Sequence, residues 1–153
     1  MQIAVDPCNR GRYAAAVKPL RLTRVRVCDR CGRGRADLAT DDGTTLTIPL
    51  DAARAAELAS ADGASGLQPL SAVVLAGIVA GGGVPTDLVL DVAGATLRGL
   101  LSIARGDDTD IVVCTPQEAV SLAVRGGLKL YATDDAIAHQ AARPAKASSE
   151  TLH

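Results

Sequence analysis

The sequence predicts a single domain of the α+β class. Its 153 residues are the usual size of one domain. Segments with strand-like and helix-like patterns follow one another, and several neighbouring strands are separated by short turns. Residues 38–63 and 102–127 also match at an offset of 64 residues, and both run through a strand, an acidic turn, a strand, a helix and a glycine. This repeat predicts an internal duplication of a strand-turn-strand-helix half, with the two halves packed into one core.

The first strand is predicted over residues 20–29, where apolar and basic side chains alternate. Val25 and Val27 are expected on one face of this strand, and Arg24 and Arg26 on the other. The glycine-containing sequence RCGRGR then predicts a turn.

A hairpin and two helices are predicted next. The Asp-Gly pair between residues 36–40 and 44–50 is a strong hairpin signal. Asp51 is expected to cap the helix that follows, and Ser71 to cap a second, apolar helix. Three consecutive glycines from Gly81 end that second helix.

The second half of the chain repeats this plan. Three strands are expected over residues 87–94, 96–105 and 110–114. Thr115 and Glu118 have the spacing of a capping box, and Pro116 takes the first helical position. Gly126 or Gly127 is expected to end the helix in the left-handed conformation. A last strand and a short last helix are expected over residues 128–132 and 133–140.

These elements define one predicted domain over residues 20–142. Residues 1–19 are predicted to be an N-terminal segment and residues 143–153 a disordered tail. We expect a cytoplasmic protein without a membrane partner, because the N-terminus lacks a signal-peptide pattern and the longest apolar run is short and glycine-rich. The chain has two Tyr, no Phe and no Trp, so its core should be aliphatic and it lacks a stacking platform for bases.

Positive charge is concentrated near the N-terminus. Residues 1–35 contain nine Lys or Arg and two Asp, whereas the rest of the chain contains seven basic and fifteen acidic residues. This asymmetry indicates an anionic partner such as RNA or DNA, with Arg21, Arg24 and Arg26 as the expected contacts. The alternative is that the basic segment neutralises an acidic neighbour, within the fold or between subunits of a homo-oligomer.

Cys28 and Cys31 form a C-x-x-C pair, which is one half of the usual ligand set of a zinc site. Zinc could be shared with Cys8 or across a dimer. The alternative is a reduced loop without metal. Cys114 ends an apolar strand and is expected in the core.

The stretch TPQEAVSLAVRGGLKLYATDDAI resembles the closing motif of the bifunctional nuclease (BFN) domain family. TTLTIPLDAARAAEL is similar to the family's first strand–helix segment, and PLSAVVLAGIVAGGG occupies the place of its apolar helix. The order of these motifs matches from about residue 20 to residue 140. The resemblance implies an α+β fold with an internal duplication and an association with cleavage of RNA and DNA.

Glu118, Asp134 and Asp135 stand at acidic positions that align with the family. Carboxylates of this kind could hold Mg²⁺ or Mn²⁺ and activate a water for phosphodiester hydrolysis. The alternative is structural: Glu118 completes its capping box, and Asp134 or Asp135 caps the last helix. The function hypotheses are therefore a metal-assisted nuclease and, as the alternative, a non-catalytic module that binds nucleic acid or protein through its basic first strand.

Overall fold

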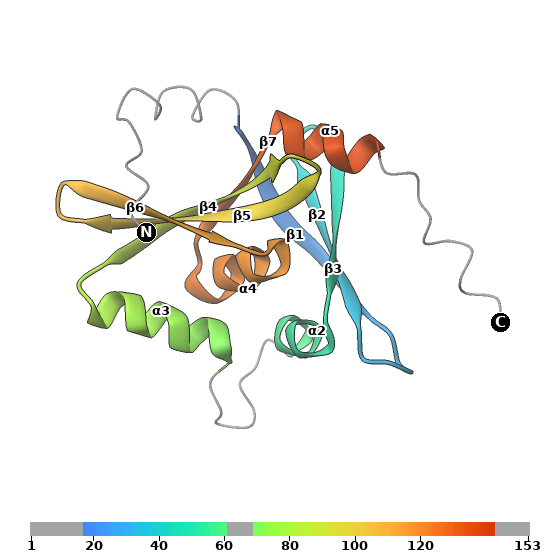
Figure 1. Cartoon of the computed structure of the whole chain (residues 1–153). Coiled ribbons are helices and arrows are strands. Elements are labelled where there is room, and N and C mark those ends of the chain that lie inside the picture. The colour runs from blue at the N-terminus through green and yellow to red at the C-terminus, as the bar shows by residue number, and fades with distance from the viewer. Residues whose placement is uncertain (1–16, 61–68, 143–153) are drawn as a thin grey trace.

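The computed structural model describes residues 17–60 and 69–142. The described strands are β1 (Val17–Val27), β2 (Gly34–Thr40), β3 (Thr45–Leu50), β4 (Val84–Ala93), β5 (Thr96–Arg105), β6 (Asp108–Cys114) and β7 (Lys129–Thr133). The described helices are α2 (Ala52–Ala59), α3 (Leu70–Ala80), α4 (Pro116–Gly126) and α5 (Asp134–Ala142). The fold therefore belongs to the predicted α+β class (Figure 1).

All seven strands form one sheet in the order β3-β2-β1-β7-β4-β5-β6. Two antiparallel three-stranded meanders, β1–β2–β3 and β4–β5–β6, lie on either side of β7. β7 pairs antiparallel with β1 and parallel with β4, so it joins the two meanders into one sheet.

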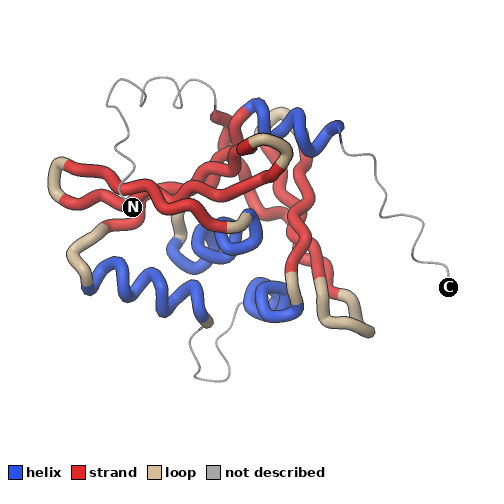
Figure 2. Tube along the Cα trace, viewed as in Figure 1, coloured by secondary structure: helices blue, strands red, loops and turns tan. Residues whose placement is uncertain are grey.

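The helices α2, α3 and α4 lie together on one side of the sheet, whereas α5 lies at the end of the sheet where β7 finishes (Figure 2). α4 is central and packs against both meanders and against α2 and α3. The buried core is aliphatic, as the composition predicts, and its largest fully buried apolar side chains are Leu38, Leu46, Ile48, Leu88, Leu90 and Val120.

The predicted helix ends are confirmed at α2 and α4. Asp51 Oδ1 accepts a hydrogen bond from the Arg54 N–H at 2.8 Å. Thr115 Oγ1 accepts from the Glu118 N–H at 3.3 Å, and Glu118 Oε2 accepts from the Thr115 N–H at 3.1 Å, which completes the capping box. Gly127 ends α4 with φ 60° and ψ 31°, in the left-handed region that glycine adopts readily.

Replacement of Thr115 by alanine should lower the free energy of unfolding by about 1 kcal/mol, because the Glu118 N–H loses its acceptor. Urea denaturation measures this change. Thr115→Ser keeps a hydroxyl at the same place and is the matched control, which should stay close to the parent protein. An unchanged urea midpoint for the alanine variant would contradict the assignment.

The prediction for Ser71 is wrong. Pro69 occupies the N-cap position of α3, and it makes no side-chain cap. Ser71 lies inside the helix, and its hydroxyl donates a hydrogen bond to Glu57 Oε1 on α2. A serine hydroxyl can cap its own helix or form a hydrogen bond with another element. Ser71 does the latter, because the buried carboxylate of Glu57 accepts its hydroxyl hydrogen.

The first strand begins at Val17 rather than at residue 20. Its first residues pair with β7, which lies far away in the sequence. Of the predicted N-terminal segment, only residues 17–19 are described, and the predicted tail over 143–153 lies outside the described residues.

The two repeated segments share an order of elements. Residues 38–60 contain the end of β2, a turn, β3 and α2, and residues 102–127 contain the end of β5, a turn, β6 and α4. In both segments the two strands are antiparallel neighbours. The duplication itself stays a prediction, which a superposition of the Cα atoms of the two segments would test.

α3 carries no charged residue, and several of its apolar side chains are exposed, including Leu70, Val73 and Val79. None of the helices in the described part of the chain has the length and apolar character needed to cross a membrane.

Candidate nucleic-acid interface

A β-bulge in β1 determines which face its arginines occupy. Leu22 pairs with Leu38 and Arg24 pairs with Asp37, so Thr23 is an extra residue in the ladder. The Thr23 hydroxyl donates to the Asp37 carbonyl at 3.0 Å and holds the bulge. Because side chains alternate along a strand, the extra residue moves Arg24 onto the face opposite the core.

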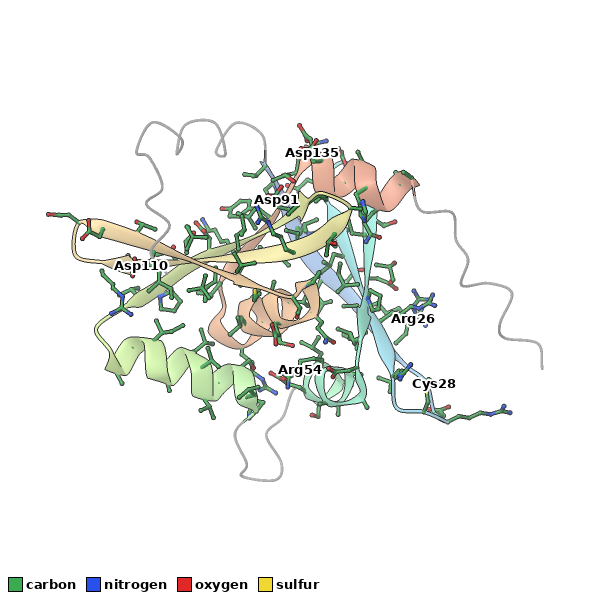
Figure 3. The ribbon with its side chains drawn as sticks, in the orientation of Figure 1. Arg26, Cys28, Arg54, Asp91, Asp110 and Asp135 are labelled. Atoms are coloured by element: carbon green, nitrogen blue, oxygen red, sulfur yellow. The ribbon has the colours of Figure 1, made fainter. Side chains whose placement is uncertain are left out.

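The outer face of the β1–β2 hairpin is therefore basic. Leu20 and Val25 pack on the core side, and the arginines point the other way, as the alternation in the sequence predicts. Figure 3 shows Arg26 directed away from the helices. The charged side chains that share this outer face are Arg21, Arg24 and Arg26 of β1 and Arg35 and Asp37 of β2.

Asp37 neutralises one of these arginines. Arg26 Nη2 lies 2.8 Å from Asp37 Oδ1, and the Thr47 hydroxyl donates to the same oxygen at 3.0 Å. Within residues 17–60 and 69–142, no ion pair is formed by Arg21 or Arg24, and both side chains are exposed. The face thus keeps unpaired positive charge that is available to an anionic ligand.

The turn between β2 and β3 has its own charge pair. Asp42 accepts hydrogen bonds from the Thr40 hydroxyl, the Thr44 N–H and Lys18 Nζ, and these bonds lower the pKa of its carboxyl well below the usual value. The Lys18 Nζ to Asp42 Oδ2 distance is 3.0 Å, and this contact raises the pKa of Lys18. Lys18 is therefore engaged inside the fold and is not a free phosphate contact.

Glu118 lies at the start of α4, and its carboxylate is used in the capping box. Pro116, at the same helix start, lines a cavity of about 240 Å³ together with His139 and Gln140 of α5. It is thus the distal part of α5 that faces the start of α4. Asp134 begins α5 and lies about 8 Å from His139 along the helix axis, at a rise of 1.5 Å per residue.

Asp134 and Asp135 are exposed in the first turn of α5. The interpretation that Asp134 or Asp135 caps α5 is wrong. The cap is Thr133, whose hydroxyl accepts a hydrogen bond from the Ala136 N–H at 3.2 Å. In the described part of the chain, no three His, Cys, Asp or Glu side chains are placed to hold one metal ion. The catalytic role of Glu118, Asp134 and Asp135 stays a prediction.

A buried carboxylate that sequence reasoning missed lies beneath the start of α5. Asp91 of β4 accepts from the Thr133 hydroxyl at 3.0 Å and from Arg98 Nη2 at 3.3 Å. Asp91 and Arg98 are cross-strand partners on β4 and β5. The signal in the sequence was one aspartate in the otherwise apolar run LVLDVAG, and Figure 3 shows Asp91 close below Asp135.

Glu57 is a second buried carboxylate that the sequence reasoning missed. Its Oε2 lies 3.5 Å from Arg54 Nη1, and its Oε1 lies 3.7 Å from Arg125 Nε and accepts from the Ser71 hydroxyl. Arg125 Nη2 also donates to the Glu57 carbonyl at 3.2 Å. This cluster joins α2, α3 and α4, so its role in the described fold is to hold three helices together.

Comparison with known protein families and with curated proteins finds no match for this chain.

Proposed function

We propose that the chain is a BFN-type domain that binds single-stranded RNA or DNA through the outer face of the β1–β2 hairpin. The β-bulge at Thr23 carries this proposal, because it aligns Arg24 and Arg26 with Arg21 on one exposed face. The binding is electrostatic and indifferent to base sequence, since the chain has two Tyr and no Phe or Trp for stacking on bases.

Cleavage is the part of the proposal that the BFN resemblance implies. Glu118, Asp134 and Asp135 are the acidic residues that would bind Mg²⁺ or Mn²⁺ and activate water. The order of steps that we propose is capture of the phosphate backbone on the arginine face, followed by slow metal-dependent hydrolysis. Binding and hydrolysis can be separated by mutation, because the arginines and the acids lie on different elements.

The double substitution Arg24→Glu with Arg26→Glu should weaken binding of single-stranded RNA and DNA alike. Arg26 is half exposed and would exchange its ion pair with Asp37 for phosphate on binding. Loss of the Arg24 and Arg26 contacts, each with a slope near −0.7 in log affinity against log salt, predicts a flattening of the slope by about 1.4. The same arithmetic predicts a loss of affinity of roughly 25-fold at 0.1 M salt. Fluorescence anisotropy with labelled strands of several sequences, titrated over a range of salt, measures both quantities.

The matched control compares two single variants, Arg24→Glu and Arg105→Glu. Both change the net charge equally, but Arg105 lies on β5, where it contacts Asp110 and the Gly81 carbonyl. Arg24→Glu should reduce affinity and Arg105→Glu should leave it close to the parent. Equal losses for the two variants, or parent binding without salt dependence, would refute the arginine face as the interface.

Glu118→Gln tests the catalytic part in the same samples. We expect unchanged binding and the loss of any cleavage that depends on Mg²⁺ or Mn²⁺. Full metal-dependent cleavage by this variant would remove Glu118 from the active site without affecting the binding proposal.

A further inference from the structure

The turn between β1 and β2 presents two exposed thiols in one compact loop. The Cys28 N–H donates to the Arg33 carbonyl at 2.7 Å, and the Gly32 N–H donates to the Cys28 carbonyl at 2.9 Å. Gly32 has φ 72°, a conformation in which a side chain would be strained. The loop is thus held by its own hydrogen bonds and by a glycine.

Several donors are directed at Cys28 Sγ. They are the backbone N–H of Cys31, the thiol of Cys31 and the backbone N–H of Arg30, all of which belong to the same turn. N–H groups directed at sulfur offset the negative charge that a thiolate keeps when it binds a metal. The C-x-x-C spacing then lets both sulfurs reach one ion.

Two thiolates select a soft or borderline metal, and the C-x-x-C spacing is typical of structural zinc. Structural zinc takes four ligands, so two more are needed. Cys114 is the other cysteine in the described residues. It lies on β6, the edge strand farthest from β1 and β2 in the order of the sheet, and burial together with the charge of Glu118 raises its pKa to about 11. Among the described residues, no third His, Cys, Asp or Glu is placed with Cys28 and Cys31 to hold one ion.

The position and charge of the turn favour a second copy as the source of the missing ligands. The turn projects beyond α2 at one extremity of the described structure, as the label of Cys28 in Figure 3 shows. Four thiolates around Zn²⁺ carry a net charge of about −2. Arg30 and Arg33 are exposed in the same turn, and such arginines from two chains would neutralise that charge.

We propose that Cys28 and Cys31 form half of a structural zinc site, and that the same pair from a second copy completes a four-thiolate site between two hairpin tips. The zinc ion joins two chains at the arginine-rich ends of their hairpins. This proposal stands on the geometry, position and charge of the turn and is independent of nucleic-acid binding.

The test uses the full chain, kept reduced and supplied with zinc chloride. After gel filtration, we expect about one zinc per two chains, together with a mass by light scattering that is twice that of the monomer. A strong chelator should return the protein to monomer. Cobalt in place of zinc should give the visible absorption of a tetrahedral centre and the near-ultraviolet bands of thiolate coordination.

Cys28→Ser and Cys31→Ser should each abolish the zinc-bound dimer, and far-ultraviolet circular dichroism should show an intact fold because both side chains are exposed. Cys114→Ser and Cys8→Ser are the matched controls, and both variants should still form the zinc-bound dimer. Cys8 lies outside the described residues. The proposal is overturned by zinc held in a monomer, by loss of zinc in Cys8→Ser, by a dimer that persists without metal, or by no retained zinc.

Discussion

Replacement of Glu57 by alanine should lower the free energy of unfolding by about 3–5 kcal/mol, the usual effect of removing one member of a buried ion cluster. The Glu57 side chain is 4% exposed, and those of Arg54 and Arg125 are 15% and 23% exposed. Without the carboxylate, two largely buried guanidinium groups lose their partner, and the Ser71 hydroxyl loses its acceptor. Such a loss is a large part of the stability of an ordinary domain.

The matched control is Asp110→Ala. It breaks the ion pair between Arg105 and Asp110, whose side chains are 47% and 40% exposed. Because solvent already screens this pair, its loss should change the unfolding free energy by less than about 1 kcal/mol. Urea unfolding of both variants gives the comparison. If Glu57→Ala lowered the free energy of unfolding as little as Asp110→Ala does, the Glu57 cluster would not be important for stability.

Replacement of Gly99 by alanine should destabilise the protein by about 1–3 kcal/mol through overpacking. A Cβ on Gly99 would lie 2.6 Å from Ala119 Cβ and 2.8 Å from Cys114 Sγ. Ordinary carbon contacts are about 3.5–4.0 Å. The start of α4 would have to move away from β5, and the capping box of Thr115 and Glu118 would move with it.

Replacement of Gly77 by alanine should instead raise the free energy of unfolding. Gly77 lies inside α3, and a Cβ there has no heavy atom within 4 Å outside its own helix. Alanine favours the helix by about 0.5–1 kcal/mol over glycine. Thermal and urea unfolding of the two variants should move in opposite directions. A stabilised Gly99→Ala variant would contradict the close packing of α4 on β5.

Local features of the fold could be predicted from the sequence. The caps at Asp51 and Thr115 and the left-handed Gly127 depend on residues that are neighbours in the chain, so a spacing of a few residues carries the whole signal. The alternation around Val25 and Arg24 likewise identified the basic face. These local predictions were confirmed, whereas the caps predicted at Ser71 and at Asp134 or Asp135 were wrong.

Features that depend on distant partners could not be predicted in the same way. The bulge at Thr23 exists only relative to the register of β2, and the contact of Ser71 with Glu57 exists only once α2 and α3 pack together. For Glu57, a signal was present. It lies between Ala55 and Leu58 on the apolar side of α2, where a charged residue must find a buried partner.

The central position of β7 has a consequence for synthesis of the chain on the ribosome. Each meander can form early, because its strands are joined by short turns. Until Lys129–Thr133 leaves the exit tunnel, however, the inner edges of β1 and β4 have no partner. Unpaired edges recruit strands from other molecules. The nascent protein is therefore most exposed to misassembly in the interval between the emergence of β4 and that of β7, and a stop codon before residue 129 would leave two open edges permanently.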